Sequence, residues 1–348
     1  MIVKLGALGD VLRTTTCLAP LKARHPSSHI TWITRGNAVE MLSGNPHIDR
    51  ILSIDDNYLE YLHAEHFDIA IGPDADQLSA SIMYLLRADE KHGLTGDGRG
   101  GILPLGDVAR AWWQLGLNDG LKRRNRQTYG EWLYAMYDLP MPVGRPFLAP
   151  TPSSIAKARA FLHAEAPDAR RWICFNTGAS GRWKEKSWKA RHYRDLALAL
   201  RADDPSLRVV IVGGPMEAEF NAHLMETQGV FTDGGTTNTI GELGALMQCC
   251  EWVVTADSLG YHVACAVGTR AVCVVGPTSP WELDLYGTNE VVYSDRECIS
   301  CYLETCPFAV TCMDDLDAQA VLSRIRPVAI PAASAVLPMR ALARHETR

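Results

Sequence analysis

The sequence predicts an α/β protein with two domains, each a parallel sheet covered by helices. Three observations support this prediction. Short apolar runs alternate with helical segments from Met1 onward, as in parallel sheets. The stretch from Pro140 to Pro152 holds five prolines and one glycine, a composition typical of a linker between domains. The stretch from Trp252 to Pro280 reads as strand, turn, helix, strand and turn, which is one unit of a parallel sheet.

Composition limits the classes of protein to which the chain can belong. Its 348 residues suffice for two domains, and 47% apolar with 21% charged residues indicate a globular chain. The net charge of −6 gives no overall attraction to nucleic acid. No stretch reaches the roughly 18 uninterrupted apolar residues of a transmembrane helix. We also read no signal peptide, because Met1 to Leu5 runs as a strand into glycines, so we expect a cytoplasmic protein that can contact a membrane surface.

The chain opens with a predicted strand, Met1 to Leu5, a loop from Gly6 to Asp10, and a helix from about Val11 to Lys22. Open α/β sheets bind ligands at the carboxyl ends of their strands, and glycines let a ligand approach the backbone closely. A carboxylate there can take a proton from an acceptor hydroxyl, so Asp10 is a candidate base. The alternative is that Asp10 only caps the helix. The loop lacks the G-x-G-x-x-G spacing, which disfavours a nicotinamide oxidoreductase.

Three more strands are predicted in the first domain, at His29 to Thr34, Ile51 to Ile54 and Phe67 to Gly72. The residues from Val108 to Leu139 are predicted to be mostly helical with interruptions. They include the basic run Lys122 to Arg126. This run is either a solvated loop or a rim that attracts an anionic acceptor or the anionic face of a membrane.

The second domain is predicted to open with a helix over Ser153 to Ala164 and a strand over Trp172 to Phe175. A further strand, Arg208 to Val212, ends in glycines, and the domain is predicted to close with a helix over Met313 to Arg326. We therefore divide the chain into a first domain at residues 1–145, a second at 153–326 and a tail at 327–348.

Two apolar runs of the second domain, Trp252 to Thr255 and Ala271 to Val275, flank a predicted helix. Asp257 and Ser258 can cap this helix, since either side-chain oxygen can accept from free N–H groups of its first turn. A helix N-terminus at the carboxyl edge of a parallel sheet stabilises an anion such as a pyrophosphate. The alternative is an ordinary strand–helix–strand crossover with no ligand.

Particular residues of this unit resemble a known family. Asp257-Ser258 with His262, followed by Gly276-Pro277-Thr278 and Pro280, resembles the donor-binding half of the family 9 glycosyltransferases, the ADP-heptose:lipopolysaccharide heptosyltransferases. The resemblance implies the GT-B fold, in which two Rossmann-like domains face each other across a cleft. The resemblance covers most of the chain, from Val3 to about Pro280.

The resemblance also implies how the donor is bound. Lys186-Ser187-Trp188 matches the family's Lys-x-Trp, whose lysine contacts the donor phosphates. Glu217 takes the place of a glutamate that binds the ribose hydroxyls, and the alternative is that it compensates a helix dipole. One departure is that the family glycine directly follows Asp-Ser, whereas here Leu259 precedes Gly260. The implied donor-binding residues are Thr177, Ser180, Lys186, Glu217, Asp257, Ser258, Leu259, Gly260 and His262.

The chemistry implied by the resemblance is an inverting, metal-independent transfer of a heptose from ADP-heptose to a hydroxyl of a lipopolysaccharide-core or related acceptor. Asp10 takes the place of the family's catalytic base, with Gly9 and Arg13 on the acceptor side. His262 either donates to a phosphate or is a buried structural imidazole. Two alternatives stay open, which are transfer to a protein hydroxyl and a module that binds a sugar nucleotide without turnover.

Four of the ten cysteines stand close together in the run 298–312, spaced as Cys298-x2-Cys301-x4-Cys306-x5-Cys312. In a chain without an export signal this density favours one structural zinc or iron ion over disulfides. The run resembles the cysteine iron finger of bacterial autotransporter heptosyltransferases, relatives that glycosylate proteins. The alternative is a reduced, metal-free cluster. Because the run follows the Gly276-Pro277-Thr278 turn, we expect it to serve structure or oligomer assembly rather than chemistry.

Overall fold

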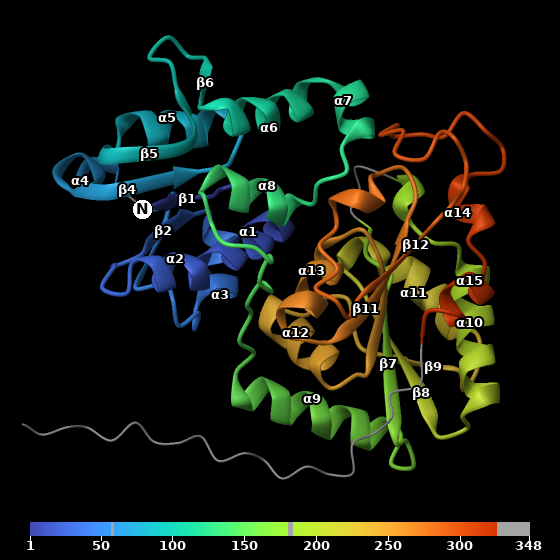
Figure 1. Ribbon diagram of the computed structural model, residues 1–348. Helices are drawn as coiled ribbons and strands as arrows, with labels where there is room; N and C mark the ends of the chain where they lie inside the picture. Colours follow the sequence, from blue (N-terminus) through green and yellow to red (C-terminus); the bar gives the residue numbers. More distant parts are fainter. Residues whose placement is uncertain (57–58, 180–183, 326–348) are drawn as a thin grey trace, which may run out of the picture.

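The computed structural model describes residues 1–56, 59–179 and 184–325, and contains two six-stranded sheets. Each half of the chain forms one sheet and the helices that cover it, and the two halves lie side by side in Figure 1. The prediction of two α/β domains with parallel sheets is confirmed. Within the described residues, no helix combines the length and the apolar character that crossing a membrane requires.

The strands of the first sheet are β1 (Ile2–Val3), β2 (Thr31–Thr34), β3 (Arg50–Ser53), β4 (His66–Gly72), β5 (Arg87–Gly96) and β6 (Ile102–Leu105). Their order is β3-β2-β1-β4-β5-β6, and only β5 and β6 pair antiparallel. The four predicted strands are confirmed as β1 to β4. The sequence analysis misses β5 because its first half is polar and partly exposed, so it lacks the apolar run of a buried strand.

The helices of the first domain are α1 (Leu8–Thr14), η1 (Thr15–Cys17), α2 (Leu18–Arg24), α3 (Gly36–Leu42), α4 (Leu59–Ala64), α5 (Gln77–Leu85), α6 (Asp107–Leu117), α7 (Asp119–Arg124) and α8 (Tyr129–Met136). The single helix predicted over Val11 to Lys22 is wrong, because the 3₁₀ turn η1 separates α1 from α2. The hydroxyl of Thr14 donates to the carbonyl of Asp10 at 2.7 Å, and that of Thr15 to the carbonyl of Leu12 at 2.6 Å. Such bonds compete with the helical backbone pattern and favour a break here.

The strands of the second sheet are β7 (Arg171–Asn176), β8 (Leu207–Val212), β9 (Phe231–Asp233), β10 (Trp252–Ala256), β11 (Arg270–Val275) and β12 (Glu290–Tyr293). Their order is β12-β11-β10-β7-β8-β9, and every neighbouring pair is parallel. The predicted strands are confirmed as β7, β8, β10 and β11, which are almost wholly buried. The edge strands β9 and β12 were not predicted.

The helices of the second domain are α9 (Pro152–Glu165), η2 (Lys184–Lys186), α10 (Ala190–Asp203), η3 (Pro215–Glu217), α11 (Ala218–Met225), α12 (Ile240–Gln248), α13 (Leu259–Ala266), η4 (Pro280–Glu282), α14 (Cys312–Asp315) and α15 (Ala318–Leu322). The closing helix predicted over Met313 to Arg326 is wrong, because α14 and α15 are separate. Asp317 caps α15 by accepting from the N–H of Ala320 at 2.9 Å, which starts a new helix there.

Helices α1 and α13 pack against each other between the two sheets, as Figure 1 shows. The residues 137–151 that join the domains contain no helix or strand. One buried apolar cluster includes Leu12 of α1, Leu148 of this connection, and Tyr261 of α13. Because α1 follows the carboxyl end of β1 and α13 follows that of β10, the ligand-binding edges of both sheets adjoin this contact.

Candidate active site

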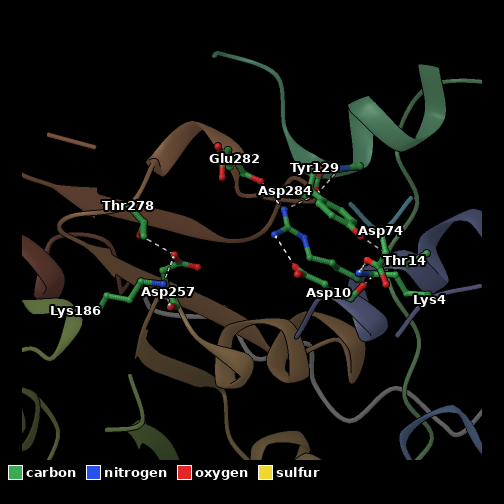
Figure 2. Close-up of polar contacts among 12 residues, drawn as sticks. Lys4, Asp10, Thr14, Asp74, Tyr129, Lys186, Asp257, Thr278, Glu282 and Asp284 are labelled. Atoms are coloured by element: carbon green, nitrogen blue, oxygen red, sulfur yellow. Dashed lines mark hydrogen bonds and ion pairs between the residues drawn. The ribbon is translucent and has the colours of Figure 1, made fainter. Parts of the chain in front are cut away.

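The donor side of the candidate site centres on Asp257, which follows β10. Lys186 donates from Nζ to the Oδ2 and to the main-chain oxygen of Asp257, both at 3.0 Å. Thr278, in the turn after β11, donates to the same Oδ2 at 2.7 Å. Burial raises the pKa of Asp257, but the charge of Lys186 and the bond from Thr278 outweigh burial and lower the pKa to about 2. Figure 2 shows this ionised cluster, which fixes the ammonium of Lys186 at the start of α13.

The N-terminus of α13 carries no side-chain cap. Ser258 occupies the N-cap position, yet neither it nor Asp257 accepts from the first-turn N–H groups, so the predicted cap is wrong. Asp257 is engaged by Lys186 and Thr278, and the Ser258 hydroxyl accepts from Nδ2 of Asn176 at 3.2 Å. The N–H groups of Leu259 and Gly260 therefore remain available to an anion, whereas that of Tyr261 donates to the carbonyl of Ser258 at 3.1 Å.

The position of Gly260 follows from the packing of Asn176. The Nδ2 of Asn176 donates to Oγ1 of Thr255 at 2.9 Å as well as to Ser258, which fixes the amide over the start of α13. A Cβ at residue 260 would collide with that amide. The chain therefore needs glycine at the second position of α13, where Gly260 stands after Leu259.

His262 lies where the two domains meet. Its side chain is buried, and burial together with the charge of Arg13 lowers its pKa to about 3, so the imidazole is neutral. A Cβ at Gly9 would lie only 2.8 Å from Cδ2 of His262, so glycine is needed for α1 to approach α13 this closely. His262 thus packs as a neutral side chain in the contact between the domains.

Asp10 lies in the first turn of α1, with its side chain 42% exposed. The N-cap of α1 is Ala7, so the alternative that Asp10 caps this helix is wrong. Among the described residues, the only ion pair of its carboxylate is with Arg13, whose Nη1 lies 3.8 Å from Oδ1. This carboxylate is therefore accessible to a hydroxyl, as a general base requires.

A cavity of about 350 Å³ runs along the loop that precedes Asp10. It is lined by Leu5, Gly6, Ala7, Leu8, Arg35, Asn37 and Asp76. These residues follow β1, β2 and β4, so the cavity opens at the carboxyl edge of the first sheet, where an acceptor can reach α1.

A buried ion pair at the ends of β1 and β4 fixes the loop between β1 and α1. Lys4 and Asp74 pair at the ends of the neighbouring strands β1 and β4, with side chains only 3% and 9% exposed. The carboxylate of Asp74 also accepts from the N–H groups of Leu5 and Gly6, at 2.7 and 2.8 Å. The pair therefore holds the backbone that leads to Asp10 in one conformation. The sequence analysis names neither residue, since a lysine within an apolar strand gives no indication of its partner.

The remaining predicted donor residues differ in their surroundings. Thr177 is buried, and its hydroxyl lies 2.6 Å from Oδ1 of Asn221 and 3.1 Å from the carbonyl of Val212, so it serves the fold. Glu217 accepts from the N–H of Gly214 at 2.9 Å, a contact that caps η3, the 3₁₀ turn before α11. Ser180 lies outside the described residues.

The basic run Lys122 to Arg126 contacts the second domain and is not a freely solvated loop. The Nζ of Lys122 lies 4.1 Å from the ring centre of Tyr302, and the guanidinium of Arg126 lies 3.7 Å from that of Trp281. Arg123 donates to the carbonyl of Cys301 at 2.7 Å. Helix α7 thus connects the first domain with the cysteine run.

The cysteine run 298–312 lies against the turn after β11 on the donor side. The N–H of Tyr302 donates to the carbonyl of Pro277 at 2.8 Å, and a Cβ at Gly276 would lie 3.2 Å from the sulfur of Cys312. In the part of the chain that the structure describes, no three His, Cys, Asp or Glu side chains form a group that could hold a metal. Burial and the other three thiols raise the pKa of Cys312 to about 11, so the four are neighbours.

Comparison with known proteins gives the family. The model for glycosyltransferase family 9 (heptosyltransferase) matches residues 58–311. Lipopolysaccharide heptosyltransferase 1 of Escherichia coli (strain K12) is 22% identical over 315 residues, which cover 84% of this chain and 92% of that protein.

Solved structures share the fold at low identity. The family 9 glycosyltransferase from Veillonella parvula DSM 2008 has a TM-score of 0.73 at 19% identity, covering 93% of this chain and 94% of that one. E. coli heptosyltransferase WaaC with ADP-2-deoxy-2-fluoro heptose has a TM-score of 0.61 at 18% identity, with 92% and 97% coverage. The dodecameric iron-containing heptosyltransferase TibC, in complex with ADP-D-β-D-heptose, has a TM-score of 0.54 at 11% identity, with 93% and 74% coverage. The chain has the GT-B fold of these structures, and the match over residues 58–311 shows that it belongs to glycosyltransferase family 9, the heptosyltransferase family.

Proposed function

We propose that this protein is an inverting, metal-independent glycosyltransferase that moves a heptose from ADP-heptose to a hydroxyl of a lipopolysaccharide-core or related acceptor. The observation that carries the proposal is the pairing of an exposed Asp10 on α1 with the Lys186–Asp257–Thr278 cluster at the uncapped start of α13. A base and an anion site thus meet at the contact of the two domains.

In the proposed reaction, Asp10 accepts the proton of the acceptor hydroxyl as the oxygen attacks the anomeric carbon. The bond from that carbon to the diphosphate breaks, its electron pair leaves with ADP, and the configuration inverts. Lys186 and the first-turn N–H groups of α13 stabilise the charge that grows on the diphosphate. They supply the stabilisation that a divalent cation gives in other enzymes.

The donor and the acceptor are parts of the proposal that rest on relatives. The E. coli relative is named for action on lipopolysaccharide, and the structural neighbours WaaC and TibC hold ADP-heptose or an analogue. The cavity of about 350 Å³ beside the loop of Asp10 is the proposed entrance for the acceptor. We expect the enzyme to work in the cytoplasm, against the inner face of the membrane.

A second candidate is transfer to a protein hydroxyl, and the cysteine run favours it. The run resembles that of the autotransporter heptosyltransferases, and TibC shares the fold and is described as iron-containing. With this candidate we propose one structural zinc or iron ion per chain at Cys298, Cys301, Cys306 and Cys312, although these sulfurs do not lie in a metal-binding arrangement in the structure. Elemental analysis of protein purified without chelator tests the ion, and a content near zero would contradict it.

The experiment that tests the function offers ADP-heptose together with one of two acceptors. One acceptor is a lipopolysaccharide core that lacks heptose, and the other is a non-glycosylated autotransporter passenger protein. Mass spectrometry of both acceptors shows which one gains a heptose. Release of ADP without a modified acceptor would indicate hydrolysis of the donor, whereas binding of ADP-heptose without turnover would favour a module that only binds the sugar nucleotide. Either result would contradict the proposal.

A further inference from the structure

The guanidinium of Arg13 lies between two carboxylates that belong to different domains. Its Nη1 is 3.8 Å from Oδ1 of Asp10, and its Nη2 is 3.9 Å from Oδ2 of Asp284. The Nη2 also donates to the carbonyl of Glu282 at 2.7 Å. A residue of α1 thus reaches η4 and the segment after it, and Figure 2 labels its three acidic neighbours Asp10, Glu282 and Asp284. The shortest contact of Arg13 is therefore with a main-chain oxygen of the second domain, and the two carboxylates share the guanidinium at nearly equal, longer distances.

Asp284 is held firmly in its place. Its side chain is only 7% exposed, and its carboxylate accepts from the hydroxyl of Thr128 and, at 3.0 Å, from the N–H of Gly130. Both donors belong to the first domain, whereas the main-chain oxygen of Asp284 accepts from the hydroxyl of Tyr261 in α13 at 2.8 Å. Asp284 thus joins α8, α13 and Arg13 at one point, and its negative charge cannot move away.

The side chain of Arg13 is also held in one orientation. Its side chain is 10% exposed, and its guanidinium lies 4.0 Å from the ring centre of Tyr129. The hydroxyl of Tyr129 in turn lies 2.7 Å from that of Thr14. A buried guanidinium with an aromatic ring on one face has little freedom to turn. The orientation of the Arg13 guanidinium therefore depends on the groups that pair with it or accept from it, which are the carboxylates of Asp10 and Asp284 and the carbonyl of Glu282.

The distance between Arg13 and Asp10 matters for the proposed chemistry, on which this inference rests. A cation in direct contact stabilises the charged form of a carboxylate and so makes it a weaker base. A base that must take a proton from a hydroxyl gains from orientation without such a contact. We propose that Asp284 is a positioning residue for the reaction, which draws Arg13 toward the second domain and so leaves Asp10 oriented but free to accept a proton.

Besides Asp284, the carboxylate of Glu282 in η4 is near enough for its charge to act on Arg13, and it accepts from the hydroxyl of Tyr302 at 3.1 Å. The remaining groups are paired, capping or uncharged. Lys4 of β1 is paired with Asp74, His262 of α13 is neutral, and Glu131 of α8 caps its own helix. Tyr129 and Tyr286 are phenols whose pKa burial raises, so they stay uncharged. Burial also raises the pKa of Asp284, against the lowering effect of Arg13 and Thr128. The carboxylate of Asp284, 3.9 Å from Nη2 of Arg13, is the acidic group of the second domain that shares this guanidinium with Asp10.

The proposal predicts shifts of opposite sign in two variants. Asn at position 284 has the size of Asp but no charge. It keeps the contact with the N–H of Gly130 and the contact with Thr128, because the Thr128 hydroxyl can accept as well as donate. In Asp284→Asn, Arg13 should turn to Asp10, so kcat falls about ten-fold, part of a general base's contribution, and the acidic limb of the kcat/KM profile moves to lower pH. In Arg13→Gln, the cation is gone, and the acidic limb should move to higher pH.

The double variant and a control complete the experiment. Asp284→Asn should not move the acidic limb in an Arg13→Gln background, because the cation through which it acts is absent. Glu251→Gln, which removes a carboxylate paired with Arg171 at the far end of the second sheet, should leave the profile unchanged. Calorimetry should give ADP the same affinity in all variants.

Several results would overturn the proposal. Shifts of the same sign in the two single variants, or equal losses of activity and melting temperature with no shift, would reduce Asp284 to a structural role. Loss of ADP affinity in Arg13→Gln would make Arg13 a donor ligand instead. If Asp284→Asn fails to fold, Arg13→Gln alone decides, since an unmoved acidic limb contradicts the proposal. A fully active Asp10→Asn variant would instead remove the proposed base, which is a failure of the proposed function itself.

Discussion

At the residue scale, Asp10 differs from the other carboxylates near it in what its oxygens contact. Asp74 and Asp284 are buried, Asp257 is partly buried, and each accepts at least two hydrogen bonds, so a proton on any of them would compete with these contacts. Asp10 is 42% exposed, and among the described residues its carboxylate accepts no hydrogen bond. A proton from an incoming hydroxyl can therefore go to Asp10 without breaking the site.

The substitution Asp10→Asn tests this reading directly. We expect kcat to fall at least about a hundred-fold, the lower end of what a general base contributes. ADP affinity measured by calorimetry should not change, because Lys186 and α13 belong to the other domain. The control is Asp119→Asn, which alters an exposed aspartate in the first turn of α7. A variant that keeps more than about a hundredth of the activity would show that Asp10 is not the base.

Lys186 is the second residue whose role can be isolated. The pKa of Asp257, at about 2, lies below the ordinary value of about 3.9, so the ionised pair stabilises the folded protein above about pH 4. That contribution is lost as the pH falls toward 2. In Lys186→Ala, burial without the cation should raise the pKa of Asp257. The free energy of unfolding should then fall by about 3 kcal/mol near neutral pH, and the difference from the wild type should shrink as the pH is lowered.

Urea denaturation at several pH values and calorimetry with ADP measure the two effects. ADP should bind more weakly to Lys186→Ala, because the variant lacks the ammonium beside α13. Lys189→Ala is the matched control, since Lys189 pairs with Glu185 at 4.0 Å and is 37% exposed. Unchanged ADP affinity in Lys186→Ala would remove this lysine from the donor site.

At the element scale, the cysteine run joins two parts of the site that lie far apart in the sequence. It rests on the turn after β11 through Tyr302 and Pro277, and it accepts from Arg123 of α7 at Cys301. Ser300 and Tyr302 have positive φ values of 64° and 56°, a backbone conformation that non-glycine residues seldom adopt. Such a turn persists only when the surrounding residues hold it in place. Substitutions in the cysteine run should therefore also disturb the turn after β11 on the donor side.

Replacing Cys301 and Cys306 with serine should therefore lower ADP affinity as well as the melting temperature. The sequence led us to expect a role in structure or oligomer assembly, and the contact with the turn after β11 adds an expected effect on the donor side. The turn after β11 carries Thr278, whose bond to Asp257 holds the anion site together. The control is Cys249→Ser, which changes a partly buried cysteine at the end of α12. A lower melting temperature with unchanged ADP affinity in the double variant would instead show that the cysteine run serves structure and not the donor site.

At the scale of the whole molecule, the sequence predicts four of the six strands in each domain. Strands β7, β8, β10 and β11 are buried on both faces and read as continuous apolar runs, so their pattern identifies them. Strand β5 carries charges over its first half and β6 pairs antiparallel with it, so neither matches the expected alternation.

Some residues of the site could not be predicted because their partners lie far away in the sequence. Asp257 and Lys186 were predicted because short motifs surround them, but Asp284 stands alone between two leucines. Its importance comes from partners more than 150 residues away, Thr128 and Gly130. The same holds for Asp74, which meets Lys4 only because β1 and β4 are neighbours. Local pattern shows neither pairing.

The approach of the two domains leads to the last prediction, which concerns Gly9. A Cβ there would lie 2.8 Å from Cδ2 of His262, closer than real contacts allow, and His262 is buried and cannot move aside freely. Gly9→Ala should push α1 away from α13 and displace Asp10 from the donor. Since a displacement of about 1 Å can cost about a hundred-fold in rate, kcat should fall by that order while ADP affinity is kept.

The matched control is Gly116→Ala in α6, where a Cβ meets nothing within 4 Å. This variant should keep full activity and gain about 0.5–1 kcal/mol of stability. Steady-state kinetics and thermal unfolding of both variants measure this contrast, and equal activity of the two would show that close contact of α1 with α13 is not needed for transfer.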